Sequence, residues 1–200
     1  MYNYYERTYY TLDDIRKEIP QFSSTSGPYA MNKETLSGFL NACLQKAGLA
    51  LHSTILEGSE ALKCFKDYIW PRFYNEVVVY TDSDESKDFV KKFAETKVGQ
   101  IFAWWISSSE KYSLLIQNLT ANKNKLLDDV KSESISRFND TPQNSGDFSD
   151  DQHTSTVTKT ENSSNVGTMM ARLNEIEDNI KQLYMDWSDE FRKFIIWSVN

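Results

Sequence analysis

The sequence has few of the residues that build catalytic or metal centres. It contains two cysteines and two histidines in 200 residues. Neither Cys43 nor Cys64 lies in a Cys-x-x-Cys motif or a Cys/His cluster. We therefore expect no metal and no cofactor, and we expect both thiols to be buried in a reducing compartment. His52 and His153 are isolated from each other, and an isolated histidine is more often structural or solvated than catalytic.

Long hydrophobic runs are absent as well. No apolar stretch approaches the roughly 20 residues that a membrane-spanning helix requires. The tyrosine-rich N-terminal stretch also differs from the apolar core of a secretion signal. The sequence contains no glycine-rich phosphate loop, no Gly-x-Ser-x-Gly elbow and no His-Glu-x-x-His helix. We expect a protein that is assembled in a cytoplasm, does not bind a membrane and is not an enzyme.

Basic residues are fewer than acidic ones, and the net charge is −7. Proteins that grip nucleic acid do so through lysine and arginine contacts to phosphate. An acidic chain can still surround DNA without holding it, because acidic walls repel phosphate. Aromatic residues, by contrast, are plentiful at 14%. A disordered chain would lack them, so we expect a folded protein with a sizeable core.

Apolar residues recur at helical spacing through the first 120 residues, and these positions predict a mostly helical bundle. Residues 2–10 are interpreted as an extended arm, and residues 76–80 as one short strand, Glu76-Val-Val-Val-Tyr80. Five helices are expected. The first runs from Thr11 to a point before Pro20, and the second from the cap Asn32 to the stop Gly48. The third runs from Ser59 to an end or kink at Pro71, the fourth from caps at 82–85 towards an interruption at Gly99, and the fifth covers 100–118.

The composition changes after this bundle. Residues 132–167 are rich in Ser, Thr, Asn, Asp and Gln and contain few large apolar side chains. Such a segment cannot bury a core by itself. The β-branched residues of 155–160 favour a strand, but only one that pairs with a partner. We interpret the segment as an extended polar loop or β-hairpin arm.

The chain continues in a long amphipathic helix. Its apolar positions follow spacings of four and three, which is a heptad seam, and a cap at Thr168 is expected. The seam either packs on the first bundle or meets neighbouring subunits. The stretch 194–197 is too apolar to be left in water and must dock. The seam positions are Met169, Leu173, Ile176, Ile180, Leu183 and Trp187, continued after a slip by Phe191 and Phe194.

Together these features predict a mainly α fold, a helical bundle with a long C-terminal helix and a polar arm inserted before it. The expected divisions are 1–131 for the helical body with its N-terminal arm, 132–167 for the arm, and 168–200 for the C-terminal helix.

One short motif stands out inside the polar segment. Asp140 can accept backbone N–H groups of the following residues in an Asx-turn, and Pro142 fixes its own φ and favours extended geometry at Thr141. Gln143 keeps donors and an acceptor free. The segment around Asp140-Thr-Pro-Gln143, followed by polar sequence and a C-terminal helix with Trp187 and Phe191, resembles collar and head-to-tail connector proteins of short-tailed bacteriophages. The stretch Tyr9-Tyr-Thr-Leu-Asp-Asp-Ile-Arg16 is similar to the opening of their lower-collar proteins. Asn139 stands where that family usually has serine.

The resemblance implies a structural virion protein of the phage neck that is assembled in the host cytoplasm. It implies a homo-oligomeric ring, of twelve copies, that joins the portal protein to the tail or knob protein and lets genomic DNA pass without sequence-specific contact. The expected interaction residues are Asp140, Thr141, Pro142, Gln143, Trp187, Phe191, Phe194 and Trp197. The alternative is a non-enzymatic regulatory or scaffold protein that binds a partner through its C-terminal heptad helix.

Overall fold

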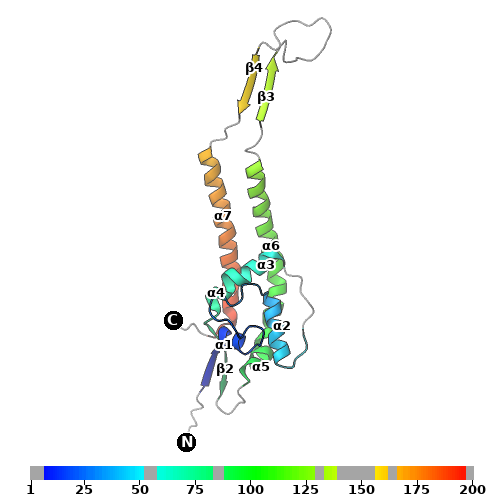
Figure 1. Cartoon of the computed structure of the whole chain (residues 1–200), viewed down its shortest axis with the longest axis vertical. Helices are drawn as coiled ribbons and strands as arrows, with labels where there is room; N and C mark the ends of the chain where they lie inside the picture. The colour runs from blue at the N-terminus through cyan, green and yellow to red at the C-terminus, as the bar shows by residue number, and fades with distance from the viewer. Residues whose placement is uncertain are drawn as a thin grey trace. The chain divides into compact units, whose positions relative to one another are not determined.

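The computed structural model describes residues 7–51, 58–82, 88–128, 133–138, 156–161 and 166–196. The chain is mainly helical, as predicted (Figure 1). It divides into two compact units, and each is described by itself. We call Met1–Gln117 with Ile180–Asn200 the body unit, and Asn118–Asn179 the hairpin unit. The ends expected at 132 and 167 for the polar arm both fall inside the hairpin unit.

The body unit begins with a strand and a short helix. Strand β1, Arg7–Thr11, leads directly into helix α1, Leu12–Lys17. The predicted cap at Thr11 is confirmed, because its side chain accepts from the Asp14 backbone N–H at 3.2 Å and the Asp14 carboxylate accepts from the Thr11 N–H at 3.0 Å. This reciprocal capping box fixes the start of α1.

Helix α2, Leu36–Lys46, is capped by Thr35 and not by the expected Asn32. The Thr35 hydroxyl accepts from the backbone N–H of Gly38 at 3.0 Å, which satisfies one of the free donors at the start of the helix. The predicted stop at Gly48 is confirmed. Gly48 has φ +68°, and the next residue, Leu49, donates its N–H to the Leu44 carbonyl at 2.9 Å. A left-handed glycine with this bond closes the C-terminus.

The helix that begins at Ser59 continues past Pro71. It consists of α3, Ser59–Cys64, a π-helical turn at Phe65–Ile69, and α4, Trp70–Phe73. Proline would clash with the carbonyl one turn earlier in a regular α-helix. The π turn inserts one extra residue immediately before the proline, so that Trp70 donates to Phe65 and the ring is accommodated. The distortion predicted at this point is therefore a π turn, and the helix does not end there.

The next helix starts later and continues further than the sequence predicted. Helix α5, Phe89–Phe93, is capped by Asp88 and not by a residue of 82–85. A second π turn, Ala94–Val98, joins it to α6, Gly99–Asp128. Gly99 therefore follows a π turn within a continuous helix. The expected end at 118 was wrong, because α6 continues into the hairpin unit, where it pairs with α7.

The expected strand is confirmed as β2, Val77–Asp82, and its partner is β1. The two strands pair antiparallel with Tyr9 opposite Tyr80, and the register shifts between Tyr10 and Thr11. The part of the predicted arm that the structure describes is thus a strand of the body. The Tyr10 ring stacks on Phe89 with centroids 3.9 Å apart, so the small sheet is attached to α5.

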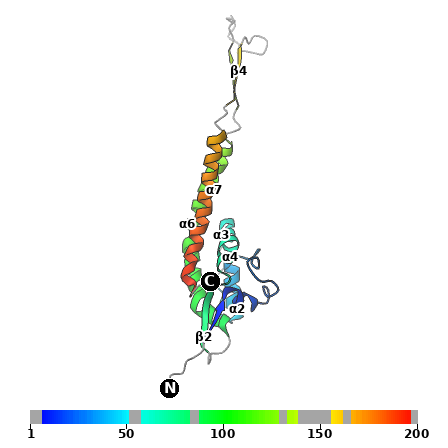
Figure 2. The same cartoon turned by 90° about the vertical axis from the view of Figure 1, so that its left-hand side faces the viewer.

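The core of the body unit is aromatic. Its largest completely buried side chains include Trp70, Trp105 and Trp187, which come from α4, α6 and α7. In Figure 2 the helices α2, α3 and α4 lie on one side of the body portions of α6 and α7. This packing of sequence-distant helices produces the core expected from the aromatic content.

The hairpin unit contains two pairs of elements. The end of α6 lies beside the beginning of α7, Val166–Asp189, and Lys123 bridges to Glu177 at 2.6 Å. Strands β3, Glu133–Phe138, and β4, Thr156–Glu161, form an antiparallel pair of their own. Helix α7 begins at Val166, two residues before the predicted cap at Thr168, and ends in a 3₁₀ turn, Glu190–Phe194, in the body unit.

Candidate functional site

Three of the eight predicted interaction residues are described by the structure, and all three are buried. Trp187 is 0% exposed, Phe191 2% and Phe194 4%. They lie at the end of α7 and in the 3₁₀ turn that follows it. The other five residues lie outside the described part of the chain: Asp140, Thr141, Pro142, Gln143 and Trp197.

Trp187 is the centre of a stack of three rings. It lies parallel to Trp105 at a centroid distance of 5.0 Å and to Tyr112 at 5.3 Å. Its indole N–H donates to the Ser108 hydroxyl at 3.0 Å. Both neighbouring rings come from α6, so this stack attaches the end of α7 to the first half of α6. A buried tryptophan with its N–H satisfied adds both apolar burial and orientation.

Glu190 joins two aromatic donors of the same helix. Its carboxylate accepts from the Trp104 indole N–H at 2.8 Å and from the Tyr112 hydroxyl at 2.8 Å. Burial and this carboxylate both raise the pKa of Tyr112 above its ordinary value of 10.0, because they disfavour the phenolate. The phenol therefore remains a neutral donor to Glu190 across the physiological range.

The two phenylalanines extend this packing beyond the helix. Phe191 contacts Phe73 and Trp104, each at a centroid distance of 5.7 Å. Phe194 packs edge-on to Trp104 at 5.6 Å. The sequence left two possibilities for the seam, packing on the body or meeting a neighbour. For the part of the seam in the body unit, the structure places the side chains in the chain's own core.

Polar contacts from α4 reinforce the same junction. The Arg72 guanidinium bonds to the Asp189 carboxylate at 2.5 Å and donates to the Ser188 hydroxyl. The ring of Tyr184 on α7 stacks on that of Tyr68, in the π turn before α4, at 4.9 Å. Arg72 and Glu190 were not recognised from the sequence, since a single charged residue on an amphipathic helix resembles any solvated one.

The apolar stretch 194–197 was predicted to dock, and this is confirmed for its first residue, Phe194. After the 3₁₀ turn Ile195 is extended, with φ −83° and ψ 135°. The next residue, Ile196, donates its N–H to the Val77 carbonyl of β2 at 2.7 Å. The chain thus approaches the sheet through the backbone, while Ile196 keeps 39% of its surface exposed.

Arg16 was also not predicted, although it is completely buried. It bonds to Asp13 at 2.7 Å and to the Phe22 carbonyl, and it thereby fixes the loop after α1. Burial alone would raise the pKa of Asp13, but hydrogen bonds from Arg16 and Lys17 outweigh it and lower the pKa. We interpret this ion pair as structural, because it is enclosed by the body.

The Asp140–Gln143 motif has a defined place in the chain order. Strands β3 and β4 are antiparallel, with Phe138 opposite Thr156. Residues 139–155 therefore connect the two strands at that end of the strand pair, and the motif lies within this connection. The predicted β-hairpin arm is thus seen as a pair of strands.

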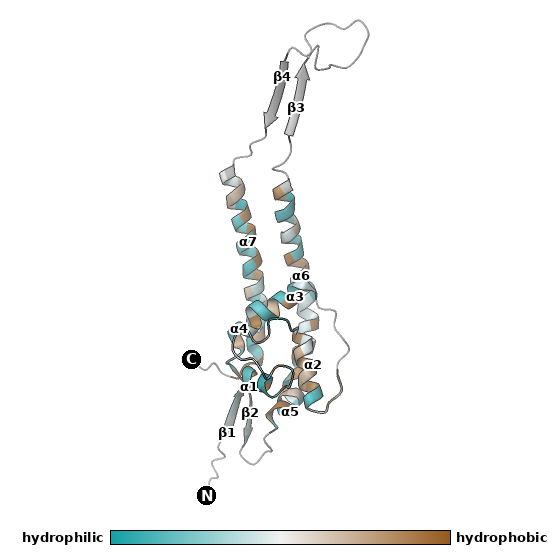
Figure 3. Ribbon diagram, viewed as in Figure 1, coloured by the Kyte–Doolittle hydropathy of each residue, from teal (hydrophilic) through white to brown (hydrophobic). Residues whose placement is uncertain are grey.

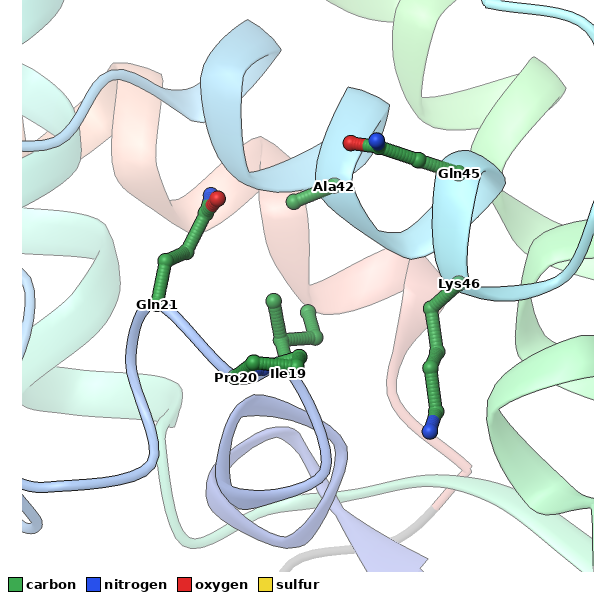
Figure 4. A pocket seen from close by; sticks show the side chains of 6 residues that line it. All are labelled: Ile19, Pro20, Gln21, Ala42, Gln45 and Lys46. Carbon is green, nitrogen blue, oxygen red and sulfur yellow. The ribbon is translucent and has the colours of Figure 1, made fainter.

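A mainly apolar pocket lies next to α2 in the body unit, with a volume of about 340 Å³ (Figure 4). Ile19, Pro20 and Ala42 supply its apolar lining, and the flexible side chains of Gln21, Gln45 and Lys46 surround them. A smaller pocket of about 230 Å³ is polar and includes Glu60, Glu110 and Ser109. Neither lining includes a histidine or a cysteine, and Glu60 and Glu110 are the two carboxylates of the second pocket.

The two thiols and the acidic groups can also be compared with the requirements of nucleophilic and metal sites. Cys43 and Cys64 are free and buried, and burial raises the pKa of both thiols, which makes them poor nucleophiles. Within the ranges that the structure describes, no cluster of three or more His, Cys, Asp or Glu side chains is placed to hold a metal ion. No helix in these ranges is long and apolar enough to cross a membrane. His52 and His153 lie outside them.

Comparison with known proteins found no matching family model, no matching curated protein and no matching solved structure.

Proposed function

We propose that this chain is a structural subunit of the neck of a short-tailed bacteriophage, a lower collar or head-to-tail adaptor, and that it is not an enzyme. The observation that carries the proposal is the place of the Asp140-Thr-Pro-Gln143 motif. In the chain order the motif lies between β3 and β4, and these two strands pair antiparallel. An arm of this kind can reach beyond its own subunit and contact the next one.

The composition of the strand pair supports such contacts. By the register, Ser134 pairs with Thr160, Ser136 with Thr158 and Phe138 with Thr156, so most paired positions carry polar residues. An isolated two-stranded hairpin is at best marginally stable in water. Both outer edges of such a pair offer backbone groups to further strands, which is the basis of β-augmentation. Strand pairs from neighbouring subunits would stabilise one another.

The body unit supports the proposal in a different way. Its aromatic core is closed by its own helices, so it serves as a rigid ring segment that does not need a partner to fold. Cyclic assembly uses two different surfaces of each subunit, and the rotation between neighbours closes the ring. We propose twelve copies, placed between the portal protein and the tail or knob protein.

The net charge of −7 suits a passage for DNA. Genomic DNA must slide through a connector without being held, and acidic surfaces do not form the phosphate contacts that hold it. We propose that DNA passes through the ring without sequence-specific contact. The mature location is the neck or tail of the virion, after assembly in the host cytoplasm.

The test is assembly of the purified full-length chain, alone and with a portal protein. Negative-stain electron microscopy is expected to show rings with a central hole, and native mass spectrometry is expected to give the mass of twelve chains. A chain that stays monomeric with portal present, and that is missing from purified virions by mass spectrometry, would disprove the proposal.

A variant of the arm tests whether assembly depends on the arm while the body still folds. Replacing residues 139–155 by a short Gly/Ser turn removes the motif but keeps the strand pair. We expect unchanged far-UV circular dichroism and thermal unfolding, together with loss of ring formation or of portal attachment. A replacement of equal length that retains Asp140-Thr-Pro-Gln143 is the matched control and is expected to assemble.

The alternative, a regulatory or scaffold protein that binds through its C-terminal heptad helix, receives less support. Trp187, Phe191 and Phe194 are enclosed in the body, so that only the earlier part of the seam remains for a partner. That alternative predicts partner binding that is insensitive to replacement of 139–155, so the same pair of variants distinguishes the two functions.

A further inference from the structure

An exposed apolar patch lies on one side of the helix pair in the hairpin unit. Leu127 on α6 is 41% exposed and Met170 on α7 is 51% exposed. Leu173 of the α7 seam is only half-buried. We call these three residues the distal patch. Large exposed apolar groups gathered on one face mark a contact surface more often than scattered ones do.

Helix geometry places the three residues on one face. The Lys123–Glu177 ion pair joins α6 to α7 and marks that side of the helix pair. Leu127 follows Lys123 by one turn, and Leu173 precedes Glu177 by one turn. Met170 precedes Glu177 by seven residues, which is close to two turns, so it has the same orientation. Because the helices are antiparallel, all three lie in the same direction from the ion pair.

Two helices alone do not cover this seam. Leu119 and Leu126 of α6 and Ile176 of α7 follow the seam spacing, yet each is only half-buried. In the body unit the seam of the same helix is completely buried at Trp187, where α6 contributes the stacked rings. In Figure 3 hydrophilic and hydrophobic residues alternate along α7. Among the described residues of the hairpin unit, the apolar side chains of the seam are therefore less covered than those in the body.

We infer that the distal patch binds the distal patch of a second copy of this chain. The arrangement of charge selects this occupant. On the face that carries the patch, the cation Lys123 lies on α6 and the anion Glu177 lies on α7, at the same level. Two such faces can be placed against each other by a two-fold axis that runs parallel to the helices. In that arrangement α6 of each copy lies against α7 of the other. Lys123 of each copy then faces Glu177 of the other, and the arrangement is self-complementary.

The apolar groups match in the same arrangement. Leu127 lies one turn beyond Lys123, at the level of Leu173, which lies one turn before Glu177. Leu127 of one copy therefore meets Leu173 and Met170 of the other. Turning one copy end over end would place Lys123 against Lys123, and the like charges would disfavour that orientation. The result is a four-helix packing that completes the half-covered seam of both copies.

This pairing does not depend on the proposed function, since it follows from the patch and its charges.

The experiment measures self-association of the full-length chain by sedimentation at concentrations up to about 100 µM, a range in which weak interfaces associate. The variants are Leu127→Glu and Met170→Lys. We expect each to weaken association by about tenfold or more, because each places a charge in the apolar contact. An equimolar mixture of the two is expected to recover association, since the carboxylate introduced in one variant then opposes the ammonium introduced in the other.

Leu114→Glu is the matched control. Leu114 is also on α6 and is 58% exposed, but it lies in the body unit. It is expected to leave association unchanged. All three positions are exposed, so the variants should fold normally, which circular dichroism checks.

The inference is overturned by a wild-type chain that shows no concentration-dependent association, by variants that associate as the wild type does, or by a mixture that recovers nothing. If residues 139–155 of the same chain cover the patch instead, the two charged substitutions would lower the thermal stability at every concentration. The mass measured by sedimentation would then be the same as for the wild type. If rings form and both variants still associate as the wild type does, the inference fails while the proposed function stands. If the wild type pairs but never forms rings, the proposed function fails and the inference stands.

Discussion

The body unit and the hairpin unit use the same helices in different ways. Helices α6 and α7 contribute to both units, with heptad-like apolar spacing along α7. In the body their seam meets α4 and the 3₁₀ turn, and Trp105, Trp187 and Phe191 are almost completely enclosed. In the hairpin unit the seam residues are half-buried. A continuous pattern in sequence therefore corresponds to a closed core in one unit and an incomplete one in the other.

The difference indicates a division of tasks. The body unit has a closed aromatic core, whereas the half-covered seam and two-stranded sheet of the hairpin unit would be stabilised by the self-association that we propose. Substitutions in the two units should therefore differ in size and in their dependence on concentration.

The largest effect is expected for Trp187→Ala. The change removes the middle ring of the Trp105–Trp187–Tyr112 stack and leaves a cavity that the surrounding rings cannot fill. We expect a loss of about 3–5 kcal/mol in the free energy of unfolding, measured by urea denaturation. Met185→Ala, two residues earlier on a more exposed part of α7, is the control and should cost well under half as much. Equal losses would contradict the role assigned to the stack.

The comparison between the units is tested most directly by one substitution made in each. Leu40→Ala removes a side chain that is 1% exposed in the body, and should cost about 2–5 kcal/mol. Leu173→Ala makes the same chemical change in the half-buried seam of the hairpin unit, and should cost about 1 kcal/mol or less for the isolated chain. Thermal unfolding of dilute samples provides the measurement. If Leu173→Ala is the more harmful, the hairpin unit has a closed core after all.

A smaller effect is expected for Glu190→Ala. The change leaves the Trp104 indole N–H and the Tyr112 hydroxyl without their acceptor, which should cost about 1–3 kcal/mol in denaturant unfolding. Glu175→Ala on the exposed surface of the hairpin unit is the control and should change the free energy of unfolding by less than about 0.5 kcal/mol. Restored stability in Glu190→Gln would show that the charge of the acceptor matters little.

The smallest effect should appear only at alkaline pH. The pKa of Tyr112 is raised in the folded chain, so its contribution is complete below about pH 10 and is lost as pH rises from there towards the folded-state pKa. In Tyr112→Phe the free energy of unfolding should therefore fall less steeply above pH 10 than in the wild type. Denaturant midpoints measured from pH 8 to 11 provide the comparison. Burial also raises the pKa of Tyr184. Part of the dependence of stability on pH should therefore remain in this variant. An unchanged slope would show that Tyr112 ionises freely.

Several local features followed directly from the sequence. The capping box at Thr11 and Asp14, the stop at Gly48 and the strand at Val77–Asp82 are set by interactions within a few residues, or by β-branched composition. The helical class and the long C-terminal helix followed from apolar periodicity. These predictions succeeded because each depends on the local chemistry of the backbone.

Other features depended on contacts between distant residues. The sequence could not show that α5 and α6 join through a π turn, or that the helix passes Pro71, because neighbouring packing selects such distortions. It could not identify Glu190 or Arg72 as central, since their partners lie on other helices.

By itself, the sequence determined which residues share the apolar face of α7, because a helical repeat fixes direction around the axis. Only the tertiary structure decided how deeply that face is covered: Trp187, Phe191 and Phe194 are enclosed in the body, whereas Leu173 and Ile176 are only half-buried in the hairpin unit. The reason is physical. Periodicity follows from the geometry of one helix, whereas burial depends on how many other elements pack against it.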